Sequence, residues 1–176
     1  MKKVLIILTA ILITGVLFAV DIVDSTDFYM STKIEEKGAV KIGDKGKTSN
    51  SVSTFNSIDS VGTSDDPILF DDDRLEAEFT VYTMINKQGS YSVGVKASPL
   101  SATGVSTKIN YTVAYGTSST ETINSDNKTF TILSGTNSGG LIFPKQDFKI
   151  TLDNTTYTNA SAGEYSTSWT IELTSN

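Results

Sequence analysis

Apolar and polar side chains alternate with a period of two through most of residues 75–173. This alternation predicts strands that each turn one apolar face toward a shared core. We expect long strands over 75–85, 91–97 and 105–115. Further strands are expected at 28–34, 40–42, 130–132, 141–143, 148–152 and 165–173.

A polar stretch, residues 43–66, interrupts the alternation and is rich in Gly, Ser and Asp. Its apolar residues Val52, Phe55, Ile58 and Val61 are spaced three apart, which is compatible with one face of a short helix. The Ser, Thr and Asn residues between them favour a long loop held by apolar contacts instead.

Seven to nine strands separated by turn residues, with no convincing amphipathic helix, predict an all-β fold. The pattern is typical of an antiparallel β-sandwich, although a closed barrel would show similar alternation. With 25 Thr and 22 Ser, the composition supports this interpretation, because Thr suits a pleated surface and Ser suits turns.

The N-terminus has the features of an export signal. Lys2 and Lys3 precede an apolar stretch from Val4 to Val16, and Ala19 offers a small residue for cleavage. We therefore expect a signal helix at 1–19 and one domain over 20–176, secreted to the periplasm or cell surface. An uncleaved membrane anchor is the alternative.

The composition excludes several classes of function. There is no His and no Cys, which removes the commonest general base, thiol nucleophiles, disulfides and the usual zinc ligands. The net charge is −6, which argues against binding to nucleic acid or to anionic lipid. We expect neither an enzyme nor, after cleavage of the signal, a membrane protein.

The C-terminal half resembles the class 5 fimbrial pilins and the spore coat protein U-like domains. The resemblance rests on 161–165 (SAGEY) leading into 169–174 (WTIELT). It also rests on 91–100 (YSVGVKASPL), followed by 109–116 (INYTVAYG). It covers residues 75–176.

This resemblance implies an immunoglobulin-like sandwich that lacks one strand and is completed by the N-terminal strand of another subunit. The donor strand would contain Phe28, Met30, Thr32 and Ile34, and the acceptor groove would flank the last strand. Such a protein would self-associate, or bind protein partners, through a sheet edge. Asp21, Asp24 and Asp27 interrupt the first part of the candidate donor, which departs from the expected alternation.

An acidic cluster precedes the first long strand. It consists of Asp65, Asp66, Asp71, Asp72 and Asp73. Carboxylate oxygens at close spacing are calcium ligands, so a calcium site is one interpretation, and no other cofactor is expected. A solvated turn explains the same residues.

Aromatic residues suggest a second kind of site, a stacking platform for carbohydrate. Most of the tyrosines and Trp169 lie in phase with the apolar side of their own strands, which indicates core packing. Tyr82 is out of phase and is the best candidate for an exposed ring. The sequence thus favours a structural or adhesive surface protein, with a non-catalytic ligand-binding module as the alternative.

Overall fold

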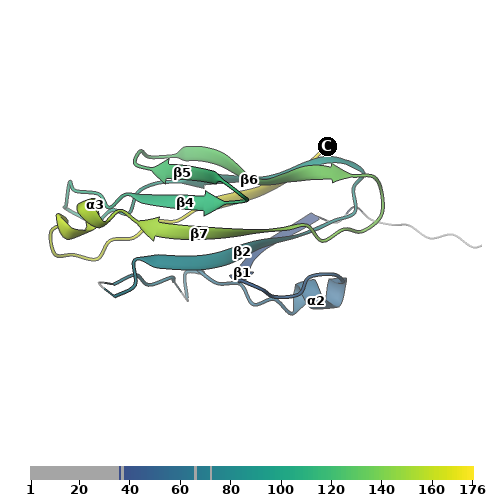
Figure 1. Ribbon diagram of the computed structural model, residues 1–176, viewed down its shortest axis with the longest axis horizontal. Helices are drawn as coiled ribbons and strands as arrows, with labels where there is room; N and C mark the ends of the chain where they lie inside the picture. Colours follow the sequence, from purple (N-terminus) through teal and green to yellow (C-terminus); the bar gives the residue numbers. More distant parts are fainter. Residues whose placement is uncertain (1–35, 37, 66, 72) are drawn as a thin grey trace, which may run out of the picture. The chain divides into compact units, whose positions relative to one another are not determined.

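The computed structural model describes residue 36 and residues 38–65, 67–71 and 73–176. Within these ranges it contains eight strands and two short helices (Figure 1). The strands are β1 (Gly38–Asp44), β2 (Glu76–Ile85), β3 (Gly89–Ala97), β4 (Tyr111–Tyr115), β5 (Ser119–Ile123), β6 (Lys128–Asn137), β7 (Lys145–Leu152) and β8 (Thr170–Ser175). The helices are α2 (Val52–Asn56) and α3 (Asn154–Thr158).

The strands form two antiparallel sheets. One sheet has five strands in the order β1-β2-β7-β4-β5, and the other has three in the order β6-β3-β8. A single apolar core contains residues from both sheets, among them Val81 of β2 and Val93 of β3, neither of which is exposed. The predicted all-β sandwich is therefore confirmed.

Alternation of side chains places the core between the sheets. In β7, the buried Phe148, Ile150 and Leu152 alternate with more exposed residues such as Lys145 and Asp147. Such alternation is what a sheet with one solvated face requires. β2, β3, β4, β5 and β6 contribute the other buried side chains of this core, namely Ala77, Phe79, Val81, Val93, Val95, Ala97, Tyr111, Val113, Ile123 and Ile132.

Residues 45–61 cover part of the outer face of the five-stranded sheet, and we call them the covering loop. Phe55 and Ile58 of this loop pack with Tyr82 in a second, smaller apolar cluster. Ser51 caps α2 by accepting a hydrogen bond from the Thr54 backbone N–H at 3.2 Å. The loop prediction is thus correct for most of 43–66, but residues 52–56 form the short helix that was the alternative.

Three further strand predictions need correction. At 141–143 there is no strand, because Ile142 makes only an isolated bridge with Ile85. The strand expected over 105–115 is restricted to β4, and Ile109 makes only an isolated bridge with Leu100. The strand expected over 165–173 begins at Thr170 and continues to Ser175. In addition, β5 was not predicted, because Ile123 is its one buried residue and offers too little alternation.

The predicted signal segment at 1–19 and the strand at 28–34 lie outside the described residues. No helix among the residues that the structure describes is long and apolar enough to cross a membrane.

Candidate functional site

The last strand of the chain, β8, is an edge strand. It pairs with β3 on one side, in a register that runs from Tyr91 opposite Ser175 to Lys96 opposite Thr170. Among the described residues, no strand pairs with its other side. One row of backbone groups along β8 therefore lacks a strand partner within this part of the chain.

The register identifies these backbone groups. The Asn176 N–H donates to the Ser90 carbonyl at 2.9 Å, so Ser90 and Asn176 are a hydrogen-bonded pair. Hydrogen-bonded and non-hydrogen-bonded pairs alternate in an antiparallel ladder. It follows that Ile171, Leu173 and Ser175 direct their N–H and C=O groups away from β3, toward the free edge.

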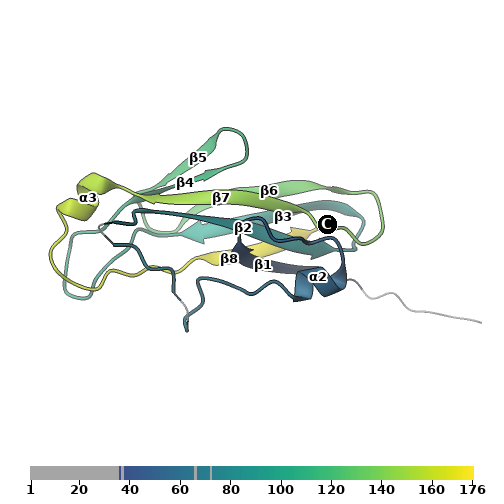
Figure 2. The same cartoon turned by 60° about the horizontal axis from the view of Figure 1, so that its bottom comes forward.

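The side chains on the inner side of this edge are apolar. Trp169, just before β8, and Ile171 and Leu173 within it are partly buried and pack against the main core, as do Val40 and Ile42 of β1. Figure 2 shows β1 and β8 beside each other, at corresponding edges of the two sheets. The two strands thus line an incompletely covered apolar strip.

The start of β8 is anchored by hydrogen bonds. The Trp169 indole N–H donates to the Tyr111 hydroxyl at 2.7 Å, and that hydroxyl donates to the Ser98 carbonyl at 3.0 Å. The Thr167 hydroxyl donates to the same carbonyl at 2.8 Å. Burial raises the pKa of Tyr111 to about 12, although the hydrogen bond from Trp169 opposes this shift. These contacts hold the edge strand in a fixed position.

The other sheet edges in the described residues are protected. The Val61 N–H from the covering loop donates to the Ile42 carbonyl at 3.0 Å, beside the edge of β1. In β6, a register shift between Val93 and Gly94 of its partner β3 marks a bulge, which disfavours pairing with another strand.

Charged side chains close the side of the sandwich between β5 and β6. Glu121 of β5 lies opposite the buried Val113 of β4, so it faces inward. Its carboxylate is 2.9 Å from the Lys128 ammonium of β6. The same ammonium donates to the Thr122 carbonyl of β5 at 2.9 Å. We call this arrangement of Glu121, Lys128 and Thr122 the charged staple.

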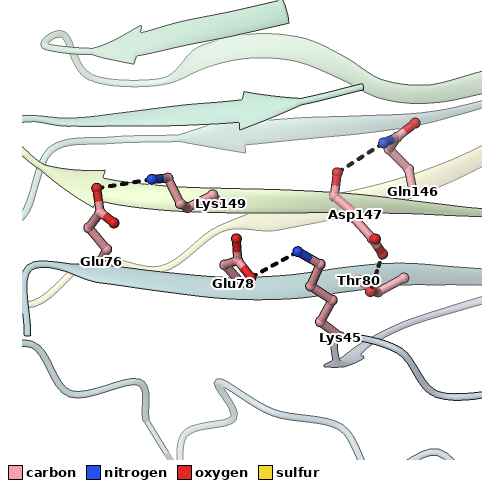
Figure 3. A network of polar contacts seen from close by, with 7 residues as sticks. All are labelled: Lys45, Glu76, Glu78, Thr80, Gln146, Asp147 and Lys149. Atoms are coloured by element: carbon pink, nitrogen blue, oxygen red, sulfur yellow. Dashed lines mark hydrogen bonds and ion pairs between the residues drawn. The ribbon is translucent and has the colours of Figure 1, made fainter. Parts of the chain in front are cut away.

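A shallow depression on the outer face of the five-stranded sheet is the other candidate site. It lies between the β4–β5 hairpin, Lys45 of the covering loop and polar residues of β2 and β7, with a volume of about 360 Å³. Lys45 contacts Glu78 at 2.8 Å and Lys149 contacts Glu76 at 3.0 Å (Figure 3). The Thr80 hydroxyl donates to Asp147 at 2.5 Å.

The charges around this depression largely satisfy one another. The hydrogen bond from Lys149 lowers the pKa of Glu76, and the hydrogen bond to Glu78 raises the pKa of Lys45. Both shifts favour the charged forms that make the ion pairs. The paired side chains are about half exposed and screened by solvent, so each pair contributes little stability.

The structure describes three of the five residues of the predicted calcium cluster, Asp65, Asp71 and Asp73. Asp71 forms a turn, in which its side chain accepts from the Asp73 N–H at 3.1 Å and its backbone pairs with Arg74. The carboxylate of Asp65 accepts a hydrogen bond from Ser64 at 3.4 Å. No group of three metal-binding side chains occurs among the described residues. Asp66 and Asp72 lie outside them.

The prediction that Tyr82 is exposed is wrong. Its side chain is fully buried by the covering loop, and its hydroxyl donates to the Asp44 carbonyl at 2.7 Å. The hydroxyl also accepts a hydrogen bond from the Lys47 N–H at 3.0 Å. Parity along a strand cannot reveal that a distant loop covers the outer face. Within the described ranges, every aromatic residue is buried or half-buried, so none offers an open platform.

The β8 edge is the place where the sequence resemblance predicted an acceptor. The sequence resemblance implied an acceptor groove beside the last strand, and β8 is an edge strand lined by apolar residues. The implied donor residues Phe28, Met30, Thr32 and Ile34 lie outside the described residues. The charged staple was missed; the one signal in the sequence is that Glu121 has the same parity as the buried Ile123, and it does not reveal the contact with Lys128.

No protein-family model matches the chain, and the comparison with curated proteins also found no match.

Proposed function

We propose that this chain is a structural subunit that associates by strand addition at the free edge of β8. The observation that carries the proposal is the contrast between the edges. Within the described residues, β8 combines unpaired backbone groups with an apolar inner side, whereas the other edges have a bulge, a covering loop or a charged staple. Unprotected edges of this kind recruit a further strand.

The added strand must satisfy two requirements. Its backbone must pair with Ile171, Leu173 and Ser175, and alternate side chains must be apolar to cover the strip shared with Val40 and Ile42. The segment 28–34 of a second copy is the candidate, because Phe28, Met30 and Ile34 are apolar and share one face with Thr32 in an extended strand. The partner we propose is therefore another copy of the chain.

This mode of association gives an open assembly. The donor segment and the acceptor edge are different surfaces, so each added copy presents a new free edge. A secreted, fimbrial-like or adhesive surface role accords with such growth and with the export signal expected at 1–19.

Substitution of Leu173 tests the proposal. Its N–H faces the free edge, so Leu173→Pro removes a donor needed by an added strand without removing a hydrogen bond to β3. Leu173→Ala is the matched control, because it shortens the same side chain and keeps the N–H. The oligomeric mass of the full-length variants is measured by size-exclusion chromatography with light scattering.

We expect the wild type to form oligomers whose mass rises with concentration. Leu173→Pro should weaken this association at least about tenfold more than Leu173→Ala, a difference of roughly 1.4 kcal/mol or more. Equal association of both variants, with folding verified by circular dichroism, would exclude β8 as the acceptor. A wild type that stays monomeric at all concentrations would exclude self-association.

A further inference from the structure

We propose that the charged staple, formed by Glu121 and Lys128, confines strand addition to the β8 side of the sandwich. The inference rests on the proposed function and adds the feature that decides at which side of the sandwich a strand can be added. A sandwich with two receptive sides would give branched aggregates, whereas one receptive side gives a linear chain of subunits.

The first argument is the position of the two side chains. Both come from edge strands, Glu121 from β5 and Lys128 from β6, and they meet across the opening between the sheets at 2.9 Å. Each side chain is 31% exposed, so the pair lies at the boundary between core and solvent. An apolar strand added here would have to displace the ion pair or bury it against its own side chains.

The second argument concerns the backbone of β5. Thr122 lies opposite Thr112, whose backbone groups are directed toward β7, so the Thr122 carbonyl faces the free edge, where it accepts a hydrogen bond from the Lys128 ammonium. Lys128 therefore occupies an acceptor that an incoming strand would need. A lysine at an edge and a charge directed inward both disfavour edge-to-edge pairing.

The third argument is the apolar surface behind the pair. Tyr115 and Phe130 stack there, with ring centroids 5.8 Å apart, and both rings are half-buried. This side thus carries partly covered apolar rings, as the β8 side does. β6 is already protected by its bulge, so the staple is the feature that distinguishes the β5 edge from the β8 edge, from which no charged side chain faces inward.

The proposal is tested in full-length protein that carries Leu173→Pro, which removes the β8 route. Glu121→Leu and Lys128→Leu are added together, so that the staple becomes apolar. The matched control adds Glu76→Leu and Lys149→Leu. These substitutions remove an exposed ion pair of similar length between β2 and β7, which are not edge strands. The weight-average mass of each variant is measured by sedimentation at increasing concentration.

We expect the apolar staple variant to associate, with its weight-average mass at least roughly doubling as dimers and larger species form. Leu173→Pro alone and the matched control should keep the monomer mass. The proposal is overturned if the staple variant stays monomeric, or if the control associates equally. Should the double substitution abolish folding, Lys128→Met in the Leu173→Pro background must associate, and its failure to do so overturns the proposal.

The two proposals fail separately in this design. If wild type and Leu173→Pro have the same mass at every concentration, the proposed function fails, irrespective of the staple. If the wild type associates through β8 but the staple variants remain monomeric, only the inference about Glu121 and Lys128 fails.

Discussion

The indole N–H of Trp169 donates a 2.7 Å hydrogen bond to the hydroxyl of Tyr111, and the two rings stack with centroids 6.3 Å apart. Trp169 immediately precedes β8, while Tyr111 begins β4 in the opposite sheet. This contact therefore connects the two sheets next to the proposed acceptor edge. Because Trp169 is the one tryptophan of the chain, its fluorescence reports on this region.

Replacement of Tyr111 by Phe should destabilise the protein. The substitution removes the acceptor of the Trp169 N–H and one of two donors to the Ser98 carbonyl. We expect a loss of about 1–3 kcal/mol in the free energy of unfolding, since a donor is left without its partner. Urea denaturation followed by Trp169 fluorescence measures it. An unchanged urea midpoint would contradict this prediction, because it would show that water replaces the hydroxyl with no loss of stability.

The same tyrosine predicts a loss of stability in alkali. Burial raises the pKa of Tyr111 from 10.0 to about 12, so the folded state retains a proton that the unfolded state releases. The contribution of Tyr111 to stability is complete below pH 10.0 and falls as pH rises through this window, by roughly 2–3 kcal/mol in total. Urea midpoints at successive pH values test this. Tyr111→Phe is the control, and an equally steep decline in that variant would exclude Tyr111 as the cause.

The packing of the covering loop against the sheet should depend on Phe55. This residue is 2% exposed and packs with Ile58 and Tyr82 against the outer face of the sheet. We expect Phe55→Ala to lower the free energy of unfolding by about 3 kcal/mol. It should also make residues 45–61 susceptible to proteolysis. Val52→Ala, on the same short helix but 36% exposed, should change stability by less than about 0.5 kcal/mol. Equal effects of the two substitutions would contradict the assigned packing.

The position of the C-terminal end of β8 should depend on Gly89. Its φ is +128°, and a Cβ atom at this position would collide with the carbonyl of Asn176. We expect Gly89→Ala to displace the C-terminus of β8 and destabilise the protein by about 1–3 kcal/mol. Gly116→Ala is the control, because its φ is also positive, at +63°, but no atom lies within 4 Å of the added Cβ. If both variants lost equal stability, backbone strain alone would explain the effect.

The sequence predicted β2, β3 and β7 well, because their inner side chains alternate regularly and bury fully. It failed at Tyr82, since the residues that cover this ring come from a loop more than twenty positions away in the chain. It also missed β5, in which Ile123 is the one buried side chain. Periodicity indicates which face of a strand is buried, but it does not indicate which strands are neighbours.

The same limit applies to the candidate site. The alternation of Trp169, Ile171 and Leu173 was visible in the sequence, and the resemblance to fimbrial domains suggested an acceptor beside them. The protection of the other edges was not visible, because Glu121–Lys128 and Val61–Ile42 are contacts between strands or loops that only the fold brings together. The contrast between edges is therefore a property of the structure.

Hydrogen exchange at individual amides of β8 tests the central claim most directly. The amides of Glu172 and Thr174 pair with β3 and should be protected in both monomer and assembly. Those of Ile171, Leu173 and Ser175 should exchange rapidly in the monomer and become protected on assembly. Assembly that leaves these three amides unprotected, and instead protects amides of β5 or β6, would contradict the account.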